Sequence, residues 1–145
     1  MTVSHLLLAA SELPLDVDTP VAGAVVAVLL AMIGVVYWVV AFGVRIGEIV
    51  WGGRHVGRLP GEQRAWSFLY GLGMFGSSIV LLELSGATDF GLLNKGWQRS
   101  AGVVVMGFLG TAGLASILKG TRWERWLFGP IALGGTALAW WLTFG

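Results

Sequence analysis

Glu83 is the only charged residue of an apolar run that extends from residue 66 to residue 85. Because burying a carboxylate in hydrocarbon is costly, an ionisable residue inside a membrane-spanning segment is a functional candidate. Ser77 and Ser78 lie one to two helical turns away in the same run and could hydrate a path to Glu83. These three residues are therefore a candidate transport path.

A simpler interpretation of Glu83 follows from its depth. It lies about one helical turn before Gly86, close to the expected membrane interface. There its carboxylate can reach water or pair with Lys95 or Arg99, and the two serines can bond to helix backbone. We favour this interpretation over a proton relay.

Basic residues gather after the first apolar run. Four arginines give this loop a basic rim: Arg45, Arg54, Arg58 and Arg64. Contact with anionic lipid headgroups is sufficient to explain them. Docking of a cytoplasmic or membrane partner is the alternative.

The patterns for cofactor, metal or nucleophile chemistry are weak. Residues 71–76 match the dinucleotide fingerprint GxGxxG, but that motif needs a preceding strand and here lies inside an apolar helix. His5 and His55 are expected on opposite sides of the membrane, and the chain has no cysteine. We therefore expect no cofactor, no metal site and no catalytic set, while a lipid-modifying enzyme built from few polar groups stays open.

The amino-acid composition of the chain is typical of a membrane protein. Of the 145 residues, 56% are hydrophobic and 12% are charged, whereas soluble domains carry about 25% charged residues. The mean hydropathy is +0.80 and the net charge is +1. These values exclude a soluble globule, a disordered tail and a nucleic-acid-binding domain, so we expect an integral membrane protein.

Four apolar segments are long enough to cross a bilayer, which takes about 20 residues. The predicted helices cover residues 20–51, 66–85, 100–119 and 122–144, and residues 20–145 form one transmembrane domain. The expected fold class is thus all-α, a four-helix bundle with short loops. Residues 1–19 are expected to be an acidic extracytoplasmic segment, because they lack the basic start and the long apolar core of a signal peptide.

The connection between the third and fourth helices carries clear stop and start signals. Gly120 follows Lys119 as a left-handed stop for the third helix. Residues 121–124, Thr-Arg-Trp-Glu, match a capping box that begins the fourth helix. We expect these two helices to form a tight hairpin.

The orientation follows from the basic residues of the loops. The first and third loops carry seven Lys and Arg and the second loop carries two, so both termini should face outside a prokaryotic inner membrane. Tryptophans at interface depth agree with this layout: Trp51, Trp66, Trp123 and Trp126 on the inner side, and Trp97, Trp140 and Trp141 on the outer side. Trp38 is the exception, in the middle of the first predicted helix.

Close packing of small residues must hold the helices together, because burial cannot drive association in lipid. Glycine supplies 23 of the 145 residues. The expected packing residues are Gly23, Ala27, Ala31, Gly102, Gly107, Gly110, Thr111, Gly113, Ala115, Gly135 and Ala139. In the third helix, the row of Gly107, Thr111 and Ala115 lies opposite Gly102 and Gly113, so this helix should contact neighbours on two sides. A general excess of glycine and alanine is the alternative explanation.

The expected function is that of a noncatalytic structural or assembly subunit of a larger membrane complex. It would act by helix packing with other integral membrane subunits or with copies of itself, in contact with membrane lipids. The alternative is a small homo-oligomeric channel or transporter, with Glu83, Ser77 and Ser78 lining the path.

Overall fold

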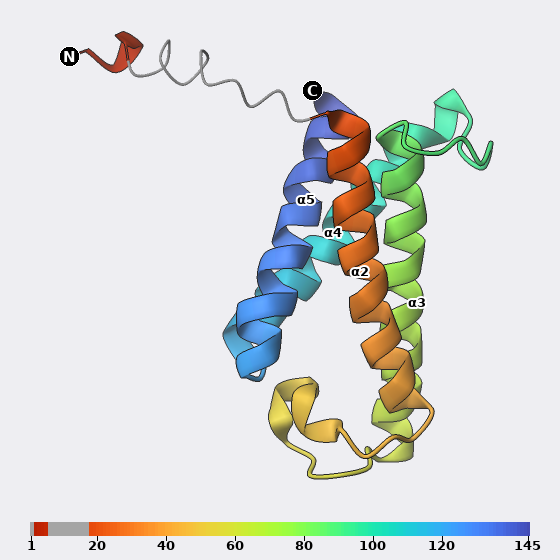
Figure 1. The fold of residues 1–145 in the computed structure, drawn as a ribbon, viewed down its shortest axis with the longest axis vertical. Helices are drawn as coiled ribbons and strands as arrows, with labels where there is room; N and C mark the ends of the chain where they lie inside the picture. The colour runs from red at the N-terminus through yellow and green to blue at the C-terminus, as the bar shows by residue number, and fades with distance from the viewer. Residues whose placement is uncertain (1, 6–17) are drawn as a thin grey trace.

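The computed structural model describes residues 2–5 and 18–145 of the chain. Most of the predicted N-terminal segment, residues 1–19, lies outside these residues. The described part is built from helices, and four of them are long and apolar enough to cross a membrane (Figure 1). The described residues are therefore all-helical, and their four spans indicate an integral membrane protein, as predicted.

The four spans are joined by connections of unequal length, residues 42–60, 85–94 and 120–123, so the first connection is longer than the predicted short loop. The first three helices are α2 (Thr19–Ala41), α3 (Gly61–Leu84) and α4 (Lys95–Lys119). The last span consists of a π-helical turn, η3 (Glu124–Phe128), followed by α5 (Gly129–Phe144). Pro130 has no amide hydrogen for the carbonyl group four residues earlier, which accounts for the wider π turn at this point.

The helices associate as two pairs, α2 with α3 and α4 with α5 (Figure 1). In the first pair the backbones meet at Gly34 and Gly71, where a Cβ atom added to Gly34 would lie 3.2 Å from the carbonyl oxygen of Gly71. In the second pair a Cβ atom on Gly113 would lie 3.2 Å from the carbonyl oxygen of Gly129. Glycine thus permits close backbone approach in both pairs.

The first helix ends at Ala41, not at Trp51 as predicted. Gly43 has a left-handed backbone (φ 95°), and the Nε of Arg64 donates a hydrogen bond of 2.8 Å to the carbonyl oxygen of Ala41. Residues 42–60 then turn back beneath the bundle and include two 3-10 turns, η1 (Gly47–Ile49) and η2 (Trp51–Gly53) (Figure 1). Two apolar side chains of this segment pack against protein: Val50 and Leu59 are 0% and 3% exposed.

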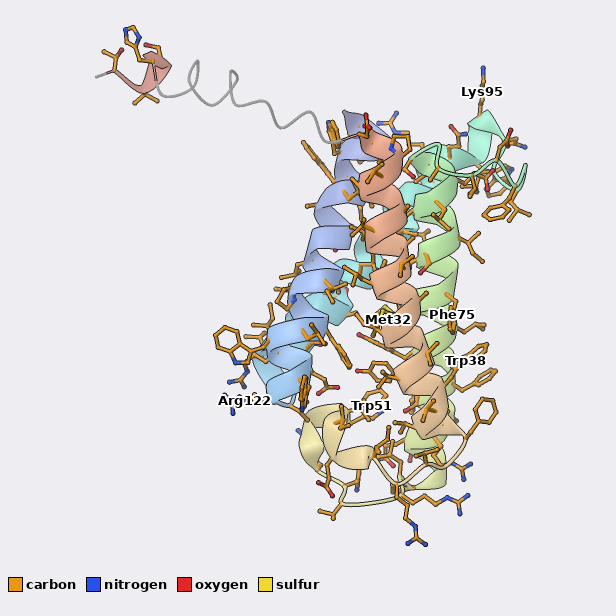
Figure 2. The ribbon with its side chains drawn as sticks, viewed as in Figure 1. Met32, Trp38, Trp51, Phe75, Lys95 and Arg122 are labelled. Carbon is orange, nitrogen blue, oxygen red and sulfur yellow. The ribbon has the colours of Figure 1, made fainter. Side chains whose placement is uncertain are left out.

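This correction also moves Trp38, which lies one turn before the end of α2 rather than in the middle of a span. Its ring stacks on Phe68, with centroids 5.4 Å apart, and its Nε1 donates to the carbonyl oxygen of Phe68 at 3.1 Å. Trp38 thus joins α2 to α3 near the lower end of the molecule as drawn in Figure 2.

Helices α3 and α4 begin earlier than residues 66 and 100, because the spans continue beyond their apolar parts. Pro60 precedes α3 directly, and Asn94 caps α4 by accepting hydrogen bonds from the backbone N–H groups of Gly96 and Trp97, at 3.1 and 3.2 Å. An asparagine side chain satisfies donors that the first turn leaves free.

Gly120 ends α4 with an extended backbone (φ −75°, ψ 166°), not with the predicted left-handed one. Its lack of a side chain matters for another reason: an added Cβ atom would collide with the carbonyl oxygen of Ser116 and lie 2.6 Å from the Cβ of Glu124. The predicted capping box is present. Thr121 N–H donates to Glu124 Oε2 at 2.8 Å, and Glu124 N–H donates to Thr121 Oγ1 at 3.2 Å.

Candidate functional site

A buried carboxylate, Glu124, joins separate parts of the chain at the lower end of the molecule. Its side chain is 4% exposed. Oε1 accepts hydrogen bonds from the Tyr37 hydroxyl at 2.9 Å and from the Trp51 backbone N–H at 2.7 Å. Oε2 accepts from the backbone N–H groups of Gly52 at 3.0 Å and Thr121 at 2.8 Å. Directed donors, none of them a cation, therefore compensate the charge.

These four bonds decide what Glu124 can do. A carboxylate offers about four lone-pair positions, and here a donor occupies each of them. In the described structure the carboxylate therefore connects α2, the η2 turn and the start of the last span. It holds the η2 turn against the start of the last span, where the Thr121 hydroxyl also donates to the carbonyl oxygen of Ile49 at 2.7 Å.

Trp51 belongs to this cluster and does not face the membrane interface as predicted. Its backbone is left-handed (φ 56°), which is uncommon for a bulky residue. Its Nε1 donates to Ser67 Oγ at 2.8 Å, and its ring lies edge-on to Tyr37 with centroids 6.3 Å apart. Six tryptophans predicted at the interface are exposed: Trp66, Trp97, Trp123, Trp126, Trp140 and Trp141.

A cavity of about 280 Å³ lies beside Glu124. The rings of Tyr37 and Tyr70 and the side chain of Ser116 form part of its wall, and two exposed cations, Arg54 and Lys119, also line it. This volume approaches the lower limit of common ligand pockets, about 300 Å³. The cavity can hold several waters or a small polar molecule.

The predicted basic rim is only partly a free surface. Arg64 is turned toward α2, where it binds the carbonyl oxygen of Ala41. Arg45, Arg54 and Arg58 are exposed and remain predicted contacts for lipid headgroups or a partner.

The three residues of the candidate transport path do not share a cavity. Glu83 Oε1 accepts a hydrogen bond of 2.7 Å from the Leu93 backbone N–H and so ties the end of α3 to the following loop. Ser78 Oγ lies on the α2 side and donates to the carbonyl oxygen of Ala27 at 2.9 Å. Ser77 instead lines a groove between α3 and α4. The serines therefore face different helices.

The predicted basic partners of Glu83 have other surroundings. The guanidinium group of Arg99 lies over the Phe144 ring, 5.1 Å from its centroid, and joins α4 to the end of α5. Lys95 is exposed and points away from the bundle (Figure 2). Glu83 Oε2 is buried and has no hydrogen-bond partner in the described part of the chain.

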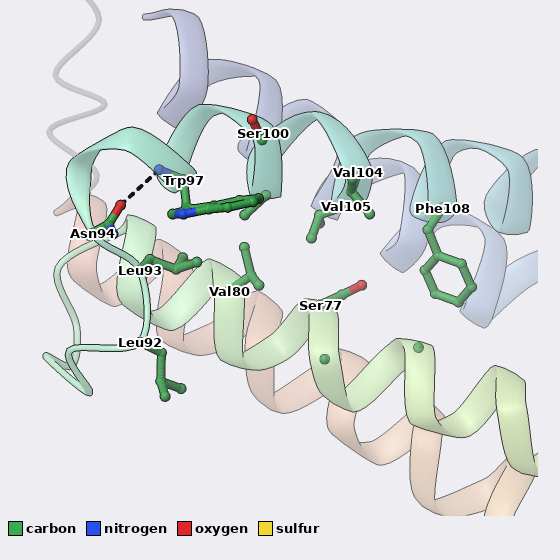
Figure 3. Close-up of a pocket in the computed structure, with 13 residues that line it drawn as sticks. Ser77, Val80, Leu92, Leu93, Asn94, Trp97, Ser100, Val104, Val105 and Phe108 are labelled. Atoms are coloured by element: carbon green, nitrogen blue, oxygen red, sulfur yellow. Dashed lines mark hydrogen bonds between the residues drawn. The ribbon is translucent and has the colours of Figure 1, made fainter.

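A groove of about 800 Å³ separates α3 from α4 in the upper half of the molecule (Figure 3). Its sides are apolar and include Val80, Val104 and Phe108, and its upper end is formed by Leu93 and Trp97. We call it the α3–α4 groove. It is lined by Gly73, Gly76, Ser77, Val80, Leu92, Leu93, Asn94, Trp97, Ser100, Ala101, Val104, Val105 and Phe108.

The predicted packing residues divide into two groups by burial. Those buried between helices of this chain are Gly23, Ala27, Gly102, Gly113, Gly135 and Ala139, with Ala31 and Gly110 half-buried. Gly107, Thr111 and Ala115 are exposed, and we call this row the free face of α4. A Cβ atom added to Gly107 would meet no heavy atom within 4 Å in the described structure. One small face of α4 thus packs on α5, whereas on the other face Gly107 meets open space in the described structure and Ala115 lines the cavity beside Glu124.

Within residues 2–5 and 18–145, no group of three or more His, Asp or Glu side chains could hold a metal ion. No protein-family model matches the chain, and no similar curated protein or solved structure was found.

Proposed function

We propose that this chain is a noncatalytic subunit of a larger membrane assembly, and that the free face of α4 packs against a helix of another subunit. The contrast between the two faces of α4 carries this proposal. Gly102 and Gly113 are buried against α5, whereas Gly107, Thr111 and Ala115, which are also small, remain exposed.

The low helix propensity of glycine supports a role for the exposed Gly107, because a glycine without a packing partner only destabilises its helix. Glycine in a helix interior costs about 1 kcal/mol relative to alanine, and no contact within the described chain requires glycine at position 107. The Thr111 hydroxyl donates to the Gly107 carbonyl oxygen at 2.7 Å, so its polar group is already satisfied. The face is therefore smooth and suited to close approach of a second helix.

The Glu124 cluster has a supporting role in this proposal. It fixes residues 42–60 beneath the junction of α4 and η3 and so links the two helix pairs at one end. A subunit that acts by packing needs a rigid surface, and satisfied buried hydrogen bonds provide it.

The experiment compares leucine substitutions on different faces during purification in mild detergent. Gly107→Leu should reduce the native particle to the size of the isolated chain while the helices stay folded, because the new side chain enters open space within the subunit. Ala65→Leu, at an exposed site of α3, is the control and should keep the large particle. A Gly107→Leu particle of unchanged mass would refute the proposal.

We further propose that both termini lie outside a prokaryotic inner membrane and that α4 and α5 insert as a tight hairpin. Residues 42–60 and the α4–η3 connection share the lower end of the molecule in Figure 1, and the predicted cytoplasmic basic residues lie in or beside these two segments. Single cysteines at His55 and Asp89 test this, with a maleimide that cannot cross the membrane. Cells should be labelled at position 89 and protected at position 55, and the reverse pattern would overturn the orientation.

A further inference from the structure

We infer that the α3–α4 groove binds one acyl chain of a membrane phospholipid. The groove lies between two membrane-spanning helices, so its open side faces hydrocarbon rather than water. Among its side chains, Ser77, Ser100 and Asn94 are polar, and the rest of the lining is apolar or glycine. The inference rests on this geometry and does not depend on the proposed role of the free face.

The length of the groove matches an acyl chain better than a helix. Along α4 it extends from Trp97 to Phe108, which is about 16 Å at 1.5 Å per residue. One leaflet of a bilayer whose hydrocarbon core is about 30 Å thick has a depth of about 15 Å. Since the groove follows one leaflet only, it matches a lipid chain, whereas a partner helix would follow the full thickness of the core.

The lower end of the groove is closed by aromatic side chains. The ring of Phe108 lies beside that of Tyr70, with centroids 5.6 Å apart. These rings separate the groove from the cavity beside Glu124, which shares none of its lining residues. An acyl chain that enters at the level of Asn94 would therefore end near the middle of the membrane.

The groove also has room for a chain. Its volume of about 800 Å³ lies within the range of ligand sites, about 300–1,000 Å³. A Cβ atom on Gly76 would meet no heavy atom within 4 Å, so this glycine leaves space open in the groove. At the upper end, the hydrogen bond from Leu93 N–H to Glu83 holds the loop that forms the mouth, and Ser100 and Asn94 offer polar atoms near headgroup depth.

Photolabelling of the full chain tests this inference. The probe is a phosphatidylcholine vesicle in which one acyl chain carries a mid-chain diazirine, and labelled residues are mapped by mass spectrometry. We expect labelling of Ala101, Val104 and Phe108 to exceed that of Val25 and Val28, exposed residues of α2, by about tenfold. Equal labelling of the two surfaces in the wild-type chain would overturn the inference without any variant.

Two substitutions fill the groove from opposite walls. Gly76→Phe and Ala101→Phe should each lower the labelling of Val104 and Phe108 at least fivefold. Gly134→Phe, at an exposed glycine of α5 with open space around it, is the matched control and should change nothing. Unchanged labelling in a folded groove-filling variant, or a crosslink from a single cysteine at Ala101 to another polypeptide in native membranes, would refute lipid occupancy.

Discussion

At the residue scale, the carboxylate of Glu124 is the main link between α2, the η2 turn and the last span. Three of its four donors are backbone N–H groups, which cannot move away without unfolding their segments. Hydrogen bonds to charged groups contribute about 1.5–3 kcal/mol each, and an unsatisfied buried donor costs a similar amount. Loss of this one group should therefore weaken the whole lower end.

Glu124→Gln tests this link with little change of shape. The amide NH₂ group would face N–H donors in place of one oxygen, so we expect the free energy of unfolding to fall by about 2–4 kcal/mol. Tyr37→Phe removes one donor and should cost about 1.5–3 kcal/mol. Unfolding in mixed detergent micelles, followed by tryptophan fluorescence, measures both values. Wild-type stability for Glu124→Gln would show that the cluster does not hold the loop.

The sequence predicts one of the two roles of Glu124, the helix cap, but not its bonds to α2 and the η2 turn. The capping box of Thr121 and Glu124 is a local pattern and could be predicted. The donors Tyr37, Trp51 and Gly52 lie 87, 73 and 72 residues away along the chain, and no local pattern indicates them. The sequence feature used to predict a functional carboxylate was a charged residue inside an apolar run, and that feature indicates Glu83 rather than Glu124.

At the scale of elements, apolar character identified all four spans but misplaced the end of the first one. Ile46, Ile49 and Val50 pack on the protein core, and hydropathy does not distinguish protein interior from lipid. The positions of Gly43 and Gly47 offered a break signal within the predicted helix. The GxGxxG match at residues 71–76 lies inside α3, as predicted, and its first two glycines contact Trp38 and Phe108 whereas Gly76 meets open space.

The two outer glycines of that match should differ in their effect on stability. A Cβ atom on Gly71 would collide with the Trp38 ring and lie 2.9 Å from the Gly34 carbonyl oxygen. We expect Gly71→Ala to lower the free energy of unfolding by about 1–3 kcal/mol through overpacking. Gly76→Ala meets open space and should raise it by about 0.5–1 kcal/mol. Equal effects of the two substitutions in the same unfolding assay would contradict the α2–α3 contact described above.

The stop at Gly120 gives a second test at this scale. An added methyl group would collide with the Ser116 carbonyl oxygen, so Gly120→Ala should displace the capping box and cost about 1–3 kcal/mol. Gly61→Ala, at the first residue of α3 with no neighbour within 4 Å, is the control and should leave stability within about 0.5 kcal/mol of the wild type. An unchanged free energy of unfolding for Gly120→Ala would contradict the close contact between Gly120 and Ser116.

At the scale of the whole molecule, the two helix pairs contact each other through α2 and α5, where Gly135 lies beside Leu30 and Val26, and α3 and α4 leave a groove between them. This arrangement leaves the α3–α4 groove open (Figure 3), and Gly107 and Thr111 of the free face are exposed. The sequence indicated that α4 has small residues on two sides. Which side the chain itself covers depends on the angle between the pairs, and that angle is set by contacts distant in sequence.

Site-directed crosslinking in native membranes tests the proposed assembly most directly. The chain has no cysteine, so a single Gly107→Cys substitution places a crosslinker on the free face alone. Val28→Cys, 59% exposed on α2, is the control. We predict an adduct with another polypeptide, or with a second copy of this chain, from position 107 and none from position 28. Absence of an adduct at position 107, or the same adduct from both positions, would contradict the account.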